Sequence, residues 1–95
     1  MVRYLCLLRF TSPGVRDLKK SPGRAAAFRK AAEKAGVKVE TQLWTTGTYD
    51  GVLILSAANH STALKAITKL AAAGDVTTNT LQAFDAKEFS AIAGG

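Results

Sequence analysis

The chain has 95 residues, enough for one domain with a small hydrophobic core. Its apolar content of 47% and charged content of 21% are typical of a globular protein and exclude a disordered chain. The longest apolar run, residues 5–8, is too short to cross a membrane, and the first residues lack the layout of a signal peptide, so we expect a cytoplasmic protein. The single cysteine, Cys6, excludes an intramolecular disulfide and a cysteine-based metal cluster.

The net charge of +6 is unevenly distributed along the chain. Residues 1–38 carry ten Lys and Arg against two acids, whereas residues 39–95 carry three Lys against five acids. A basic segment of this kind raises the question of an anionic partner such as nucleic acid. A solvated basic helix face explains the same pattern, and we favour that interpretation.

The first element in chain order is a strand at residues 2–10, which is apolar on both faces and is therefore expected in the centre of a sheet. Two Ser-Pro-Gly triplets follow, in which each Ser suits a helix N-cap. We expect a short helical turn at 15–20 and a main helix that begins at its cap, Ser21, and reaches about Ala35. Its inward stripe is Ala25, Phe28, Ala32 and Ala35.

Residues 37–45 alternate as an edge strand with one buried face. The buried positions are predicted to be Val37, Val39, Thr41 and Leu43. Trp44 breaks this pattern, because it falls on the polar face. After a turn at 46–49, residues 52–57 are apolar on both faces and predict a second central strand.

The second half of the chain repeats the order helix and strand. Asn59 or Ser61 can cap a helix that ends at Gly74, and residues 76–84 form a Thr-rich edge strand. The buried stripe of the helix is predicted to be Ala63, Leu64, Ile67, Leu70 and Ala71. A capping box at 85–88 starts a short terminal helix, whose inner face is Phe89 and Ile92.

The order of elements predicts an α+β, ferredoxin-like βαββαβ fold with an antiparallel sheet of strand order 4-1-3-2. Two helices can cover only one face of this sheet, yet the central strands supply apolar side chains to both. Monomers rarely leave such a face exposed. We therefore favour dimerisation, sheet against sheet, over a ligand or a lid that covers the same face.

Three residues are candidates for a ligand site or an interface. Tyr49 and Asp50 place a phenol next to a carboxylate, although both also suit a structural role at a turn, and neighbours in a strand point to opposite faces. Trp44 could line a cavity or lie in a dimer contact. Tyr4 is expected in the core, and the lone His60 has no second metal ligand at suitable spacing. We predict no catalytic residue, no metal and no cofactor.

The side chains of the central strands argue against nucleic acid as a partner. The RNA-recognition motif shares the predicted topology and stacks bases on aromatic side chains of its first and third strands. The third strand here, residues 51–57, is aliphatic, so the stacking platform is missing. Charge alone would leave a weak, salt-sensitive interaction.

Several segments carry a resemblance to a known family. They are Tyr4 to Thr11 with Gly14, Ser21-Pro22 with Arg24, Thr46-Gly47-Thr48-Tyr49-Asp50, Gly74 to Thr78, Thr80 to Phe84, and Glu88-Phe89. In these segments, which extend over nearly the whole chain, the sequence resembles the GYD domain family. The resemblance implies a ferredoxin-like domain of the dimeric α/β-barrel type with no established biochemical role. Gly51 departs from it, because a bulky aliphatic residue is commoner there.

Two functions remain open at this point. The first is a non-enzymatic homo-oligomeric module that binds itself and either binds a small ligand or has a structural role. The second is a cofactor-free oxygenase or isomerase of the dimeric α/β-barrel type that acts on a small aromatic-like substrate, an analogy of fold alone. The residues favour the first.

Overall fold

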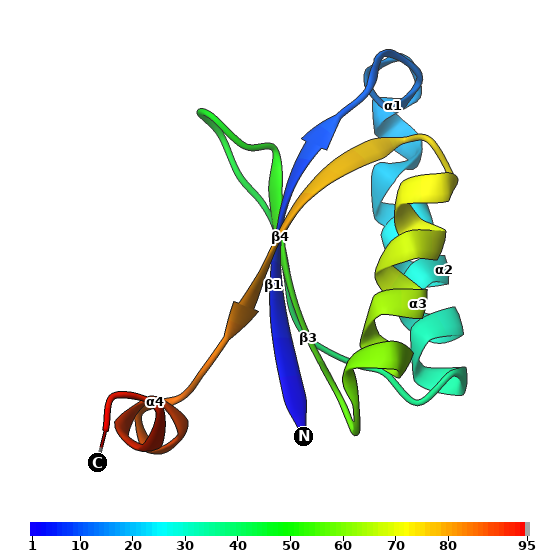
Figure 1. The fold of residues 1–95 in the computed structure, drawn as a ribbon. Coiled ribbons are helices and arrows are strands. Elements are labelled where there is room, and N and C mark those ends of the chain that lie inside the picture. Colours follow the sequence, from blue (N-terminus) through cyan, green and yellow to red (C-terminus); the bar gives the residue numbers. More distant parts are fainter. Residues whose placement is uncertain (95) are drawn as a thin grey trace.

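The computed structural model describes residues 1–94 as one four-stranded sheet with helices on both sides (Figure 1). The elements are β1 (Val2–Phe10), α1 (Ser12–Arg16), the 3-10 helix η1 (Leu18–Lys20), α2 (Ser21–Lys34), β2 (Lys38–Trp44), β3 (Gly51–Ala57), α3 (His60–Ala72), β4 (Val76–Ala83) and α4 (Ala86–Ile92). The strand order is β2-β3-β1-β4, and every neighbouring pair is antiparallel. The predicted ferredoxin-like fold, with β1 and β3 in the centre, is confirmed.

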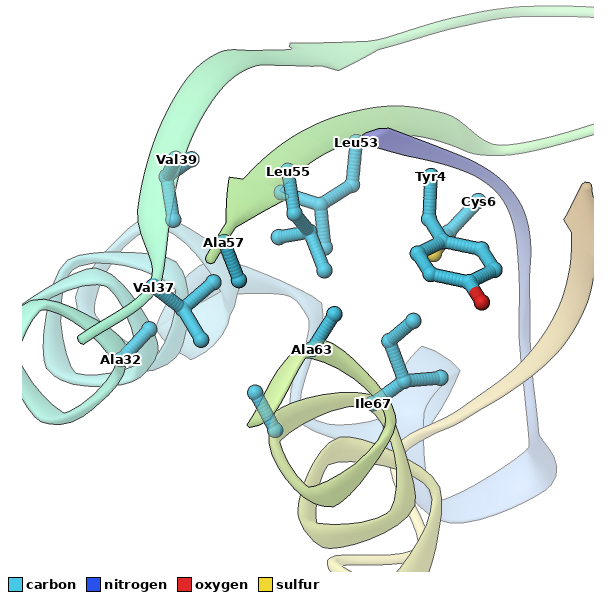
Figure 2. Packing of buried hydrophobic residues seen from close by; sticks show 11 residues of the cluster. Tyr4, Cys6, Ala32, Val37, Val39, Leu53, Leu55, Ala57, Ala63 and Ile67 are labelled. Carbon is cyan, nitrogen blue, oxygen red and sulfur yellow. The ribbon is translucent and has the colours of Figure 1, made fainter. Parts of the chain in front are cut away.

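Helices α1, α2 and α3 lie on one side of the sheet, which we call the covered face (Figure 1). The buried side chains between this face and the helices form one cluster (Figure 2). Its largest fully buried members are Leu53, Leu55, Val37 and Cys6. From α3, Ala63 and Ile67 point toward the sheet and pack near Leu55 and Tyr4, so this part of the covered face is closed within the chain.

A β-bulge in β2 changes which side chains face the helices. Val39 pairs with Leu55, but the next paired residue is Thr41, opposite Ile54, so the register shifts by one at Glu40. Because the side-chain period of a strand is two, the shift moves every later residue to the other face. The prediction that Thr41 and Leu43 share the buried face of Val39 was therefore wrong.

The same bulge explains Trp44. Trp44 pairs with Gly51, and the preceding Gln42 pairs with the buried Leu53, so the Trp44 side chain lies on the covered face. What looks in the sequence like a misplaced aromatic residue is a covered-face residue displaced by one position.

The N-caps of the first two helices differ from the prediction. Thr11, not Ser12, caps α1 by accepting a hydrogen bond from the Gly14 amide, and this helix starts and ends earlier than the expected turn at 15–20. Helix α2 follows η1 without a break, so Ser21 is already helical and its hydroxyl is free for another partner. The prediction of Ser21 as a cap was wrong. The 3-10 helix η1 directly precedes α2, so the chain is already helical at Ser21.

The other helix ends follow the sequence. Asn59 caps α3, and Gly36 and Gly74 both have a positive φ after their helices. The predicted stripes are correct in their centres, at Ala32, Ala63 and Ile67, which are buried. They fail at some flanking positions, where the side chains are exposed: Ala35, Leu64 and Ala71.

Helix α4 lies on the opposite side of the sheet from the other helices (Figure 1). The Asp85–Glu88 capping box is present with both of its hydrogen bonds. However, Phe89 and Ile92 are each 58% exposed, so the expectation of an inner face packed against this chain was wrong. The Cα radius of gyration of 14.0 Å exceeds the value of about 12.4 Å typical of a compact domain of this length, as expected for a projecting arm.

Within residues 1–94, no helix has the length and apolar character needed to span a membrane.

Candidate functional site

The side of the sheet away from α2 and α3, which we call the open face, carries an apolar patch at its centre. The pairing register places the side chains of its members on this side: Leu5, Leu7, Leu43, Val52, Ile54 and Leu81. Leu43 is 58% exposed and Leu81 is 47% exposed, while the four members on the central strands are half-buried. A continuous exposed apolar patch of this kind marks an interaction surface.

One end of the open face holds a cluster of charged side chains. Arg3 Nε donates to Glu40 Oε2 at 3.2 Å, and Arg3 Nη1 donates to Glu88 Oε1 at 3.3 Å. The hydrogen bond to Glu40 raises the pKa of Arg3 above its ordinary value, so the guanidinium stays charged throughout the folded range. Since Glu88 belongs to α4, this ion pair anchors the projecting arm to the open face.

Tyr49 lies at the opposite end of the open face. The Arg9 guanidinium carbon is 5.1 Å from the centroid of the Tyr49 ring, and the Asn79 amide donates to the Tyr49 hydroxyl at 3.2 Å. Arg9 and Asn79 come from β1 and β4, so Tyr49 ties the β2–β3 connection to the sheet. Of the three candidate residues, it is the one placed beside the apolar patch.

Asp50 has a structural role that its type alone does not reveal. Its carboxylate Oδ2 accepts a hydrogen bond from the Phe10 amide at 2.8 Å, and its own amide donates to the Leu8 carbonyl at 2.8 Å. Its carbonyl accepts from the Thr45 amide at 2.9 Å. Asp50 thus joins the end of β1 to the turn before β3, and it lies away from the surroundings of Tyr49.

Trp44 lies on the covered face, near the start of α2. Its indole Nε1 donates to Ser21 Oγ at 3.0 Å, which is the hydrogen bond made by the hydroxyl that does not cap the helix. Trp44 and Asp50 both line a cavity under the helices, whereas Tyr49 does not. The three predicted residues are therefore divided between two surfaces.

Two contacts were missed by sequence reasoning. The Tyr4 hydroxyl and His60 Nδ1 are 2.8 Å apart, with the rings edge to face, so Tyr4 is in the core as predicted but reaches the first turn of α3. Cys6 is fully buried, and its burial raises the pKa of the thiol, opposed by a weak contact from the Thr80 hydroxyl. Tyr4 and His60 are 56 positions apart in the sequence, so no local pattern indicates that pair.

The GYD domain family model matches residues 4–93 of this sequence. The chain belongs to the GYD domain family. The match begins within β1 and includes every later strand and helix, so it covers nearly all of the described fold.

A curated relative is similar over most of its length. It is a "Glutamine synthetase and cystathionine beta-lyase binding protein" from Thermus thermophilus, 33% identical over 84 residues, which cover 87% of this chain and 88% of the relative. The search of solved structures gives no match.

Proposed function

We propose that this GYD domain is a homodimeric binding module of the dimeric α/β-barrel type, in which two copies pack their open faces together and the dimer binds another protein. The observation that carries the proposal is the exposure of Leu43 and Leu81 beside the half-buried centre of the open face. The helices of this chain already cover the other face, so the open patch needs an occupant from outside the chain.

A second copy suits this surface for reasons of symmetry and charge. A two-fold contact presents the same patch from both sides, so the apolar centre meets an apolar centre. The charged end of the open face carries Arg3 together with Glu40 and Glu88. It therefore presents both a positive and a negative charge to the same surface of a second copy. Phe89 and Ile92 on the projecting α4 supply additional apolar surface at the same side.

The dimer is tested by placing a charge on the open face. We expect Leu81→Asp to weaken self-association at least about tenfold, because burying an unpaired carboxylate costs several kcal/mol. Leu64→Asp is the matched control, since Leu64 is similarly exposed, at 43%, on the outer side of α3. Sedimentation velocity across a concentration series measures both. Equal association of the two variants would contradict the proposal.

The relative's name supports a protein partner. We extend it to this chain and propose that the dimer binds glutamine synthetase or cystathionine beta-lyase from the organism that encodes it. Mixing the chain with each purified enzyme should give a faster-sedimenting complex, and an unrelated enzyme of similar size should not. Sedimentation of both enzymes unchanged would overturn this part of the proposal.

The same mixtures identify a different occupant of the open face. If the chain alone sediments as a monomer, yet forms a complex with an enzyme that Leu81→Asp abolishes and Leu64→Asp retains, then the open face docks the enzyme. That result would contradict the homodimer while keeping the binding module.

A further inference from the structure

A cavity of about 380 Å³ lies between the covered face and helices α2 and α3. It occupies the end of this layer where β3 begins and β1 ends, beyond the packed core around Leu55 and Ala63. Its volume is within the range of small-molecule pockets. A concave, largely apolar pocket of this size with a few polar groups on its wall is typical of a ligand site.

The cavity exists because small residues meet at this end of the layer. Gly51 lies between Trp44 and Leu8 in one row across the sheet, and it contributes no side chain. Above the row lie Ala25 of α2 and Ala73, the residue that follows α3. At the packed end of the same layer, Leu55 and Val37 fill the equivalent space.

The cavity wall is largely apolar and carries three aromatic side chains. They are Phe10, Phe28 and Trp44, which come from β1, α2 and β2. Aromatic side chains pack against a flat ring with edge-to-face or offset contacts. The wall therefore favours an aromatic ligand over a branched aliphatic one.

The charged side chains at the cavity balance one another. Arg24 Nε lies 3.5 Å from Asp75 Oδ2, and the Arg24 guanidinium also donates to backbone carbonyls of Asp17 and Gly14. Lys69 and Asp50 are the other two charged residues on the wall, one of each sign. With two cationic and two anionic side chains, the site does not attract a ligand of either sign, and an uncharged ligand avoids the cost of burying a charge.

Two polar groups can fix the ligand's orientation. Asp50 uses Oδ2 for the Phe10 amide, which leaves Oδ1 to accept a hydrogen bond from a ligand. Ser21 Oγ accepts from Trp44 Nε1, so its own proton can be donated. A hydroxyl group on the ligand can donate to the first and accept from the second.

An apolar approach leads from the surface to this cavity. A shallower depression shares Phe10, Ser21, Trp44 and Asp50 with it. The outer wall of the depression is formed by Val15 and Leu18, which are 57% and 50% exposed. Exposed apolar side chains at this position suit an entrance for an apolar ligand.

We propose that this cavity binds an uncharged aromatic alcohol or phenol, with the ring between the sheet and α2 and the hydroxyl at Asp50. The site lies on the covered face, so this inference does not depend on the dimer or on a protein partner.

The test compares four probes that share a 4-propylphenyl core and differ in the polar group on the ring. They are 4-propylphenol, 4-propylanisole, 4-propylbenzoate and 4-propylbenzylamine, titrated into the full chain by heteronuclear NMR. We expect saturable binding of the phenol at one site per chain. We expect at least about tenfold weaker binding of the other three, because the anisole cannot donate to Asp50 and the charged probes lose hydration.

The resonances that move locate the site. The indole N–H of Trp44 and the methyl groups of Leu53 and Leu70 should shift, while the methyl groups of Leu5 and Leu7 on the open face should not. Shifts centred on the open face, or equal binding of all four probes, would overturn the proposal. So would the absence of phenol binding up to millimolar concentration.

A substitution that fills the cavity, compared with one on the exposed side of the same helix, tests the site independently. Ala25→Phe should reduce phenol affinity at least about tenfold, because the new ring occupies the ligand's place. Ala26→Phe, one position along α2 and exposed, should retain the affinity. If Ala25→Phe does not fold, Ala73→Phe fills the cavity from the end of α3. Retained affinity in the folded, filled variant would contradict the proposal.

Discussion

The two faces of the sheet are built from the same strands but are closed in different ways. On the covered face, Cys6, Leu53 and Leu55 are fully buried under helices of the same chain. On the open face, Leu5 and Leu7, which flank Cys6 along β1, remain half-buried. The difference shows that strand sequence alone prepares both faces for burial, while the number of helices decides which face is completed within the chain.

The largest expected effect concerns the covered face. Leu55→Ala should lower the free energy of unfolding by about 2–5 kcal/mol, because it removes fully buried side-chain atoms and leaves a cavity. Leu64→Ala, on the exposed side of α3, should change it by less than about 1 kcal/mol. Urea denaturation at one fixed protein concentration measures both, since self-association also contributes. Equal losses would show that the covered face is not the core.

The next effect concerns the contact between α1 and the start of β4, near the cavity on the covered face. A Cβ on the buried Gly14 would overlap the Asp75 carbonyl, which accepts from the Thr11 amide and joins α1 to the start of β4. Gly14→Ala should therefore destabilise the fold by about 1–3 kcal/mol.

Gly23→Ala provides the control for Gly14. A Cβ at Gly23 meets no atom of the described chain within 4 Å, and alanine is the better helix former. This variant should be as stable as the parent or more stable, by up to about 1 kcal/mol, in the same denaturation experiment. A stable Gly14→Ala protein would show that the contact between α1 and β4 is dispensable.

The smallest effect is a pH dependence from Cys6. Burial raises the pKa of this thiol, so its contribution to stability is complete below the ordinary thiol pKa and is lost as the pH rises through the folded-state value. As the pH rises above the ordinary thiol pKa of about 8.5, the parent should lose stability relative to Cys6→Ala. If the free energy of unfolding of the two proteins changes with pH in the same way, the Cys6 thiol is not buried as described.

Much of the fold could be predicted from the sequence. Alternation along β2 and β4, and apolar runs in β1 and β3, set the centre and the edges of the sheet because burial on one or two faces leaves a direct pattern. The α3 cap at Asn59 and the capping box at Asp85 are equally local, since each bond joins residues three apart.

The errors arose where a distant or inserted element changed a local pattern. Glu40 in the bulge moved Leu43 and Trp44 to the opposite faces, and the one visible sign was an aromatic residue out of phase. Ser21 lost its capping role to the preceding 3-10 turn and bonded Trp44 instead. The placement of Trp44 on the covered face follows from this shift, whereas the separation of Tyr49 from Asp50 agrees with the alternation expected of neighbouring residues.

Sedimentation equilibrium of the unmodified chain at micromolar concentration tests most directly whether a second copy closes the open face. We expect a mass of twice the 10.0 kDa of the chain. A mass of 10.0 kDa at all concentrations, with the protein folded, would contradict it.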